Sequence, residues 1–114
     1  MNVDQIKKCL IASDEFVKTP LESLQTLDSW KIDVLRQELG EHKSDVETYI
    51  LSVRGELRES ITKGGEQVSE TALKNICEEQ TREELKLLNK IKNMRALLNN
   101  KKQLLMGDAF GKGF

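Results

Sequence analysis

Aromatic residues are scarce in this chain, and long apolar runs are missing altogether. Only five of its 114 residues are Phe, Tyr or Trp, whereas charged residues make up 32%. So little aromatic volume argues against a thick globular core and favours long helices with a narrow apolar seam. No run of about 18 apolar residues occurs, so the sequence contains no obvious membrane-spanning helix. These features predict a soluble, all-α chain.

Cysteine and histidine, the usual residues of metal sites and nucleophilic catalysis, are also rare. Cys9 and Cys77 stand far apart without ligand spacing, and we expect two small buried apolar side chains. The single histidine, His42, falls on an apolar seam, so we expect a packed or partly exposed seam residue and not a catalytic base. No nucleophile, base and stabilising group converge, so we predict a protein that is not an enzyme and needs no cofactor or metal. We recognise no signal peptide, and the expected compartment is the cytoplasm.

Apolar residues recur at helical spacing through most of the chain. A short helix is predicted over residues 2–12, with Asn2 or Asp4 as its cap, followed by a linker to residue 18. A long helix is predicted from about 20 to 62, and a second from about 70 to 106. The first long helix carries a heptad seam made of Ile32, Leu35, Leu39, His42, Val46, Tyr49 and Val53. Residues 19–106 therefore read as a helical hairpin or coiled coil, and residues 107–114 as a flexible, glycine-rich tail.

The ends of these helices carry recognisable signals. Thr19 is the predicted cap of the long helix, Pro20 its first residue and Glu22 the partner in a capping box. Gly64-Gly65 is the predicted hinge, because glycine adopts the left-handed conformation that helix C-termini often need. Ser69 is the predicted cap of the next helix.

The predicted second long helix has a widened apolar face. We assign Leu87, Ile91, Met94, Leu98 and Leu105 to an interface between copies, because such long seams are hard for one subunit to cover. Leu97 and Leu104 widen this face further. In the tail, Phe110 and Phe114 are either a docking element for a partner or part of a disordered end.

Charge is unevenly placed along the chain. Residues 1–84 have a net charge of −7 and residues 85–114 a net charge of +6. A local basic surface can bind polyanions although the whole chain is slightly acidic. The candidate nucleic-acid-binding residues are Lys63, Lys86, Lys90, Lys92, Arg95, Lys101 and Lys102. The alternative is an ordinary solvated basic face, with cations near a helix C-terminus complementing its dipole.

This layout resembles the UvsY-like recombination mediators of tailed phages. The likeness spans about residues 20–106. It rests on Trp30-Lys31 early in a long helix, on the basic, Gly-containing break that begins at Lys63, and on the Leu- and Lys-rich run from Lys92. The resemblance implies a ring-like homo-oligomer that binds single-stranded DNA, assists a recombinase in displacing a single-strand-binding protein, and works in the host cytoplasm. The acidic first 84 residues depart from the family pattern.

Two functional hypotheses follow. In the first, the chain is an oligomeric accessory protein that binds single-stranded nucleic acid. In the second, it is a structural or adaptor coiled coil, such as an assembly factor or a subunit of a helical complex, without nucleic-acid binding. Both share the helical hairpin and the absence of an active site.

Overall fold

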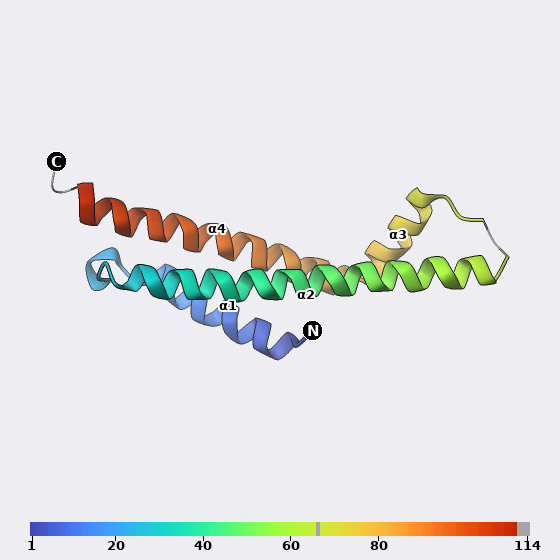
Figure 1. The fold of residues 1–114 in the computed structure, drawn as a ribbon, viewed down its shortest axis with the longest axis horizontal. Coiled ribbons are helices and arrows are strands. Elements are labelled where there is room, and N and C mark those ends of the chain that lie inside the picture. Colours follow the sequence, from blue (N-terminus) through green and yellow to red (C-terminus); the bar gives the residue numbers. More distant parts are fainter. Residues whose placement is uncertain (66, 112–114) are drawn as a thin grey trace.

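The computed structural model describes residues 1–65 and 67–111, with side-chain environments up to residue 107. This part of the chain forms four α-helices and one 3-10 turn, and it contains no strand. The molecule measures 68 × 28 × 17 Å and is therefore a rod (Figure 1). The prediction of an all-α helical hairpin is confirmed.

Helix α1 covers Val3–Lys18 and begins as its sequence predicts. The side chain of Asn2 accepts a hydrogen bond of 3.1 Å from the backbone N–H of Gln5, which satisfies one of the otherwise unpaired groups of the first turn. The helix is longer than the predicted 2–12 segment. Its extra turns bury Ser13, whose hydroxyl donates to the carbonyl of Cys9 at 2.7 Å, so a polar residue enters the bundle without an unsatisfied group.

The predicted capping box at Thr19 is wrong. Thr19 is the C-cap of α1, and its hydroxyl donates to the carbonyl of Glu15 at 2.8 Å. Pro20 holds the preceding residue in an extended conformation, and only the 3-10 turn Leu21–Ser23 follows it. Leu21 and Leu24 pack against the core of the bundle, so tertiary contacts keep this segment out of the long helix.

Helix α2 covers Asp28–Lys63 and is the helix along which the other three helices pack. Its 36 residues span about 54 Å at 1.5 Å per residue. It passes through Gly40 and Gly55 without a break, as the apolar pattern predicts. It ends at Gly64-Gly65, where Gly65 has a φ of 75°, a conformation that an L residue adopts only at a cost. The end of the helix therefore coincides with the glycine pair that the sequence marks as a hinge.

The second long helix is interrupted near its start. Helix α3 covers Glu70–Gln80, capped by the Ser69 hydroxyl as predicted, and α4 covers Arg82–Gly111. Thr81 separates them, although its backbone N–H still donates to the carbonyl of Cys77 at 2.9 Å. The buried Thr81 hydroxyl also donates to that carbonyl, at 2.7 Å, and such back-bonding bends helices.

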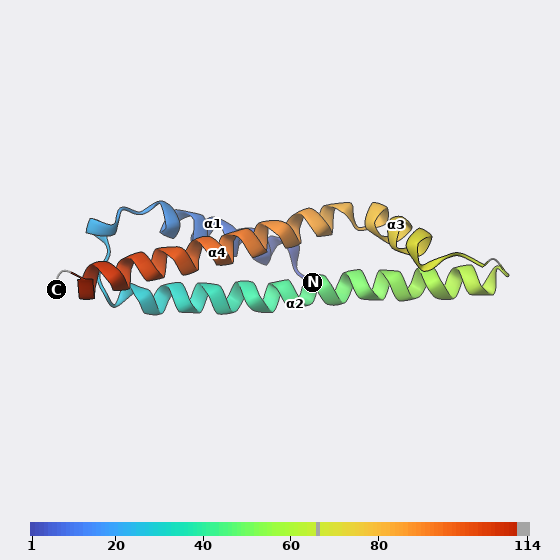
Figure 2. The ribbon, with the colours of Figure 1, turned by 90° about the horizontal axis from the view of Figure 1, so that it is seen from above.

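Three helices form the core of the bundle. Residues of α1, α2 and α4 meet in one cluster: Ile6, Cys9, Ile32, Leu39, Val46, Leu88, Ile91, Leu98 and Leu105. Helix α4 folds back along the first half of α2, and α1 packs against both (Figure 2). The second half of α2 is covered by α3 instead (Figure 1). The rod is thus a three-helix bundle that continues into a two-helix arm.

Helix α4 continues through Gly111, five residues beyond its predicted end at 106. Part of the segment predicted as a flexible tail is therefore helical. The side chain of Phe110 and the whole of Phe114 lie outside the described residues, so their assignment to a docking element stays a prediction.

Candidate binding groove between α1 and α4

The predicted nucleic-acid contacts near the C-terminal end of α4 hold the bundle together. Lys102 Nζ lies 2.8 and 2.9 Å from the two carboxylate oxygens of Asp33 on α2. Lys101 Nζ donates a hydrogen bond to the backbone carbonyl of Thr19, just after α1. These two lysines are half-buried and have internal partners, which makes them poor candidates for holding phosphates.

Arg95 is engaged in the same way. A Cβ atom built on Gly40 of α2 would lie 3.4 Å from a terminal guanidinium nitrogen of Arg95, so this glycine leaves room for the arginine side chain. The Nε atom of Arg95 is buried without a hydrogen-bond partner. Arg95 therefore crosses the α2–α4 interface and does not extend freely into solvent.

The remaining candidate cations do not share one face. Lys63 lies at the hinge end of α2 and pairs with Glu59 at 3.1 Å, whereas α4 follows the opposite half of α2 (Figure 1). At about 100° per residue, Lys90 and Lys92 leave α4 about 200° apart. Lys86 lies 3.7 Å from Glu83 in an exposed pair. The predicted basic cluster is therefore dispersed over several surfaces.

The residues assigned to an interface between copies are largely used inside one chain. Ile91 and Leu98 are completely buried and Leu105 is 4% exposed, all against α1 and α2. Leu87 and Met94 are half-buried at the edge of the same cluster. The assignment of Ile91, Leu98 and Leu105 to an intermolecular interface is therefore wrong for this structure. The physical reason is that α4 folds back on α2, so the chain covers its own seam.

An apolar groove remains open on the other side of α4. It has a volume of about 650 Å³ and runs between α1 and α4. Its apolar lining consists of Leu10 and Ile11 of α1 and of Met94 and Leu97 of α4. Ile11 is 61% exposed and Leu97 45% exposed, and both line the same groove, so they belong to one open apolar patch.

The rim of this groove is charged, with opposite signs at its two ends. Lys7 and Lys90 line one end, and Asp14 and Glu15 line the other. Helices α1 and α4 run in the same direction, and the contact from Lys101 to the Thr19 carbonyl fixes their register (Figure 1). Asp14 is paired with Lys18 at 2.7 Å. Within the described part of the chain, Lys7, Lys90 and Glu15 take part in no ion pair.

Part of this groove was visible in the sequence and part was not. The widening of the second long helix by Leu97 and Leu104 predicts more than one neighbour, and α4 does contact both α1 and α2. Ile11 was missed. The signal for it was the adjacent Leu10-Ile11 pair, which gives α1 an apolar face wider than one neighbour can cover.

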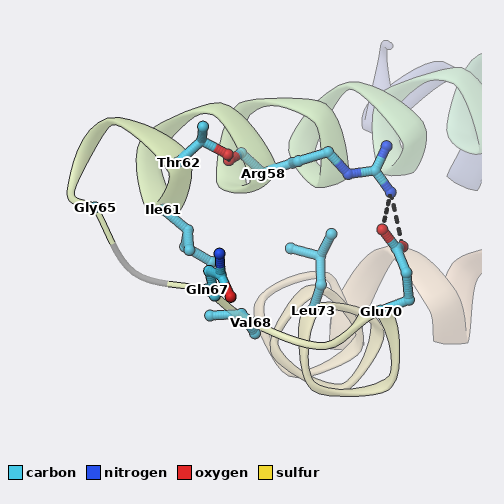
Figure 3. A pocket seen from close by; sticks show the side chains of 8 residues that line it. All are labelled: Arg58, Ile61, Thr62, Gly65, Gln67, Val68, Glu70 and Leu73. Carbon is cyan, nitrogen blue, oxygen red and sulfur yellow. Dashed lines mark hydrogen bonds and ion pairs between the residues drawn. The ribbon is translucent and has the colours of Figure 1, made fainter.

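A second cavity, of about 580 Å³, lies beside the hinge (Figure 3). Ile61, Val68 and Leu73 supply its apolar lining. Glu70 at the start of α3 closes one side, with its carboxylate oxygens 2.7 and 3.0 Å from a guanidinium nitrogen of Arg58. This ion pair joins α2 and α3, and because it is exposed to solvent its contribution to stability is small.

Cys9, Glu38 and His42 line a small cavity between α1 and α2. The Cys9 thiol donates to a Glu38 carboxylate oxygen at 3.6 Å. Burial and the neighbouring Glu38 carboxylate raise the pKa of Cys9 to about 11, because both disfavour the thiolate. A thiol that stays protonated at neutral pH is a weak nucleophile. Cys77 is also buried, with its thiol directed at the Ile50 carbonyl.

No protein-family model, curated protein or solved structure matches this chain. Across residues 1–65 and 67–111, His, Cys, Asp and Glu form no group of three or more suited to a metal ion. None of the helices described combines the length and apolar character needed to cross a membrane. The groove between α1 and α4 is the feature from which a function is best argued.

Proposed function

We propose that this chain is a helical assembly protein that associates with itself through the groove between α1 and α4. One observation carries the proposal: Ile11 and Leu97 stay 61% and 45% exposed over a groove of about 650 Å³, although α1 and α4 supply six of the nine buried side chains of the core. Exposed apolar patches of this kind are typical of protein interaction sites.

The energetic argument is that covering the groove removes apolar surface from water. Each large aliphatic side chain contributes about 1.5–3 kcal/mol when it passes from full exposure to full burial. Ile11 and Leu97 are about half exposed, and an interface between two copies covers both residues in each copy. Helices with such faces are usually completed by another helix, in the same or in a second chain.

Sedimentation velocity tests the proposal directly. The measured mass is expected to rise with concentration between about 1 and about 200 µM, the range in which a modest interface dissociates. The double variant Ile11→Asp/Leu97→Asp is expected to remain monomeric over the same range, with unchanged helix content. A wild-type chain that stays monomeric throughout would refute self-association through this groove.

A second candidate function, contact with a polyanion, is favoured by a different observation. Lys7 of α1 and Lys86 and Lys90 of α4 line one connected region at the cationic end of the groove. Lysines from two helices can contact successive phosphates. Single-stranded DNA as the ligand would agree with the resemblance to UvsY-like mediators. Glu83 and Glu84 line the same region and oppose such binding.

Titration with a labelled single-stranded oligonucleotide separates the two candidates. Phosphate contacts release counterions, so the logarithm of the affinity falls by about 0.7 per contact for each tenfold rise in salt. Lys90→Glu is the informative variant, and Lys74→Glu, on α3 and away from the groove, is its matched control. Absence of binding at low salt would remove the nucleic-acid candidate and leave the assembly proposal intact.

A further inference from the structure

Three residues of α1 form a charge pattern that is complementary to itself. Lys7, Ile11 and Glu15 are spaced by four residues, so they lie on one face of the helix. Ile11, in the middle, is largely exposed, and the two charged residues flank it at equal distances along the axis. Lys7 and Glu15 are about 12 Å apart along α1, too far to pair with each other within one chain.

Helix α4 presents a cation at one end of the groove and an apolar side chain at the other. Lys90 lies at the same end of the groove as Lys7, and Leu97 lies at the end formed by Asp14 and Glu15. The midpoint between Lys90 and Leu97 falls at Asn93 and Met94, which line the groove together with Ile11. A single two-fold axis across the groove can therefore relate both helices to their copies.

We propose, on the basis of the assembly function above, that the occupant of the groove is a second copy of the chain lying antiparallel to the first. A two-fold axis through Ile11 then places Lys7 of each copy over Glu15 of the other. Ile11 meets Ile11 of the second copy, and Leu97 packs beneath the aliphatic stem of Lys90. Such an isologous contact closes on itself and gives a dimer.

The charges select this orientation over the alternative. A parallel arrangement would bring Lys7 and Lys90 of both copies together at one end and Asp14 and Glu15 of both copies together at the other. Like charges at an interface cost energy and exclude that register. In the antiparallel arrangement Lys7 and Glu15, which take part in no ion pair within the described residues, gain partners, while Asp14 keeps Lys18.

Charge reversal and its rescue test this geometry. Lys7→Glu alone and Glu15→Lys alone each turn two intermolecular attractions into repulsions. We expect each to raise the dimer dissociation constant by roughly 3- to 30-fold, since exposed pairs contribute modestly and two are affected. The double variant Lys7→Glu/Glu15→Lys restores the pattern with reversed signs, and its dissociation constant is expected within about threefold of the wild type. Neither single change opposes the dipole of α1, so loss of the dimer would not reflect loss of the helix.

An apolar pair of variants isolates the centre of the interface. Ile11→Asp places two carboxylates at the two-fold axis and is expected to weaken the dimer at least about 100-fold. Leu51→Asp is the matched control, because Leu51 is 65% exposed, close to the 61% of Ile11, and lies on the α2 arm away from the groove. Leu51→Asp is expected to leave the dissociation constant unchanged. Circular dichroism of each variant checks that its helix content is retained.

The outcomes distinguish this inference from the proposed function. A dimer that ignores both charge reversals, or whose double variant is no better than the singles, overturns the antiparallel geometry and leaves self-association standing. A wild-type chain that is monomeric overturns both. A dimer that appears only when oligonucleotide is added also overturns the inference, because bound nucleic acid would then hold the copies together.

Discussion

Leu98→Ala tests whether the apolar seam of α4 is buried by its own chain or by another copy. Leu98 is completely buried in the cluster formed by α1, α2 and α4. The substitution removes three carbon atoms from a site where the helices cannot collapse fully. Leucine-to-alanine changes in such cores cost about 3–5 kcal/mol, of which the transfer of the lost atoms accounts for about 2.4 kcal/mol and the remaining cavity for the rest.

The matched control is its neighbour, Leu97→Ala. Leu97 is 45% exposed, so the same loss of atoms removes about half as much burial and leaves no closed cavity. Both changes have the same effect on helix propensity, so this contribution cancels in the comparison. We expect Leu97→Ala to cost about 1 kcal/mol in the isolated chain. The difference between the two variants, about 2–4 kcal/mol, is then due to burial alone.

Urea unfolding followed by far-ultraviolet circular dichroism measures both values, at two protein concentrations about 30-fold apart. A core within one chain gives a loss for Leu98→Ala that is the same at both concentrations. A seam shared between copies gives a loss that depends on concentration, because unfolding would then include dissociation. Equal losses for Leu97→Ala and Leu98→Ala, or a concentration-dependent loss for Leu98→Ala, would refute the intramolecular core.

Three further predictions concern the hinge, the cysteine and the helix break. Gly65→Ala is expected to lower the free energy of unfolding by about 1 kcal/mol, because Gly65 has a positive φ. Gly55→Ala is expected to raise it by about 0.5–1 kcal/mol, because a Cβ atom at this helical position meets nothing within 4 Å. Thermal unfolding of the two variants checks both signs. The Cys9 pKa is raised from 9.0 to about 11, so folding disfavours its thiolate. The protonated thiol's contribution to the free energy of unfolding is fully present below pH 9 and is lost as pH rises toward 11. Glu38→Gln is expected to move the pH profile of Cys9 alkylation to lower pH. Unchanged profiles would exclude the Glu38 contact. Thr81→Val removes the buried hydroxyl bond to the Cys77 carbonyl and is expected to cost about 1 kcal/mol in urea unfolding, while a stabilised variant would show that the bend is strained.

Local rules account for the parts of the fold that the sequence predicted correctly. Asn2 and Ser69 cap their helices because a short polar side chain can reach a free backbone N–H two or three residues on, and this needs no other part of the molecule. Gly65 ends α2 for an equally local reason, its positive φ. The buried seam of α2, with Ile32 and Leu39, follows from helical spacing alone.

Local rules failed where two local signals competed or where tertiary packing decided. Thr19, Pro20 and Glu22 fit a helix start, but the same threonine also closes α1, and the apolar contacts of Leu21 and Leu24 favour the second role. Thr81 has no breaking signal of its own. Its buried hydroxyl donates to a carbonyl of the preceding turn, and this back-bonding favours a bend at the position where α3 ends.

The sequence by itself determined that the chain is helical, where α1 and α3 begin, where α2 ends, and which side chains must leave water. Only the tertiary structure decided what covers them: Leu98 is buried by its own chain, whereas Ile11 is left open. It also decided that Lys102 pairs with Asp33, 69 residues away in the sequence. The physical reason is that the hydrophobic effect is non-directional and that a charge can pair with any opposite charge nearby. Which residues cover an apolar side chain, and which charge pairs with which, is therefore decided only when the helices pack together.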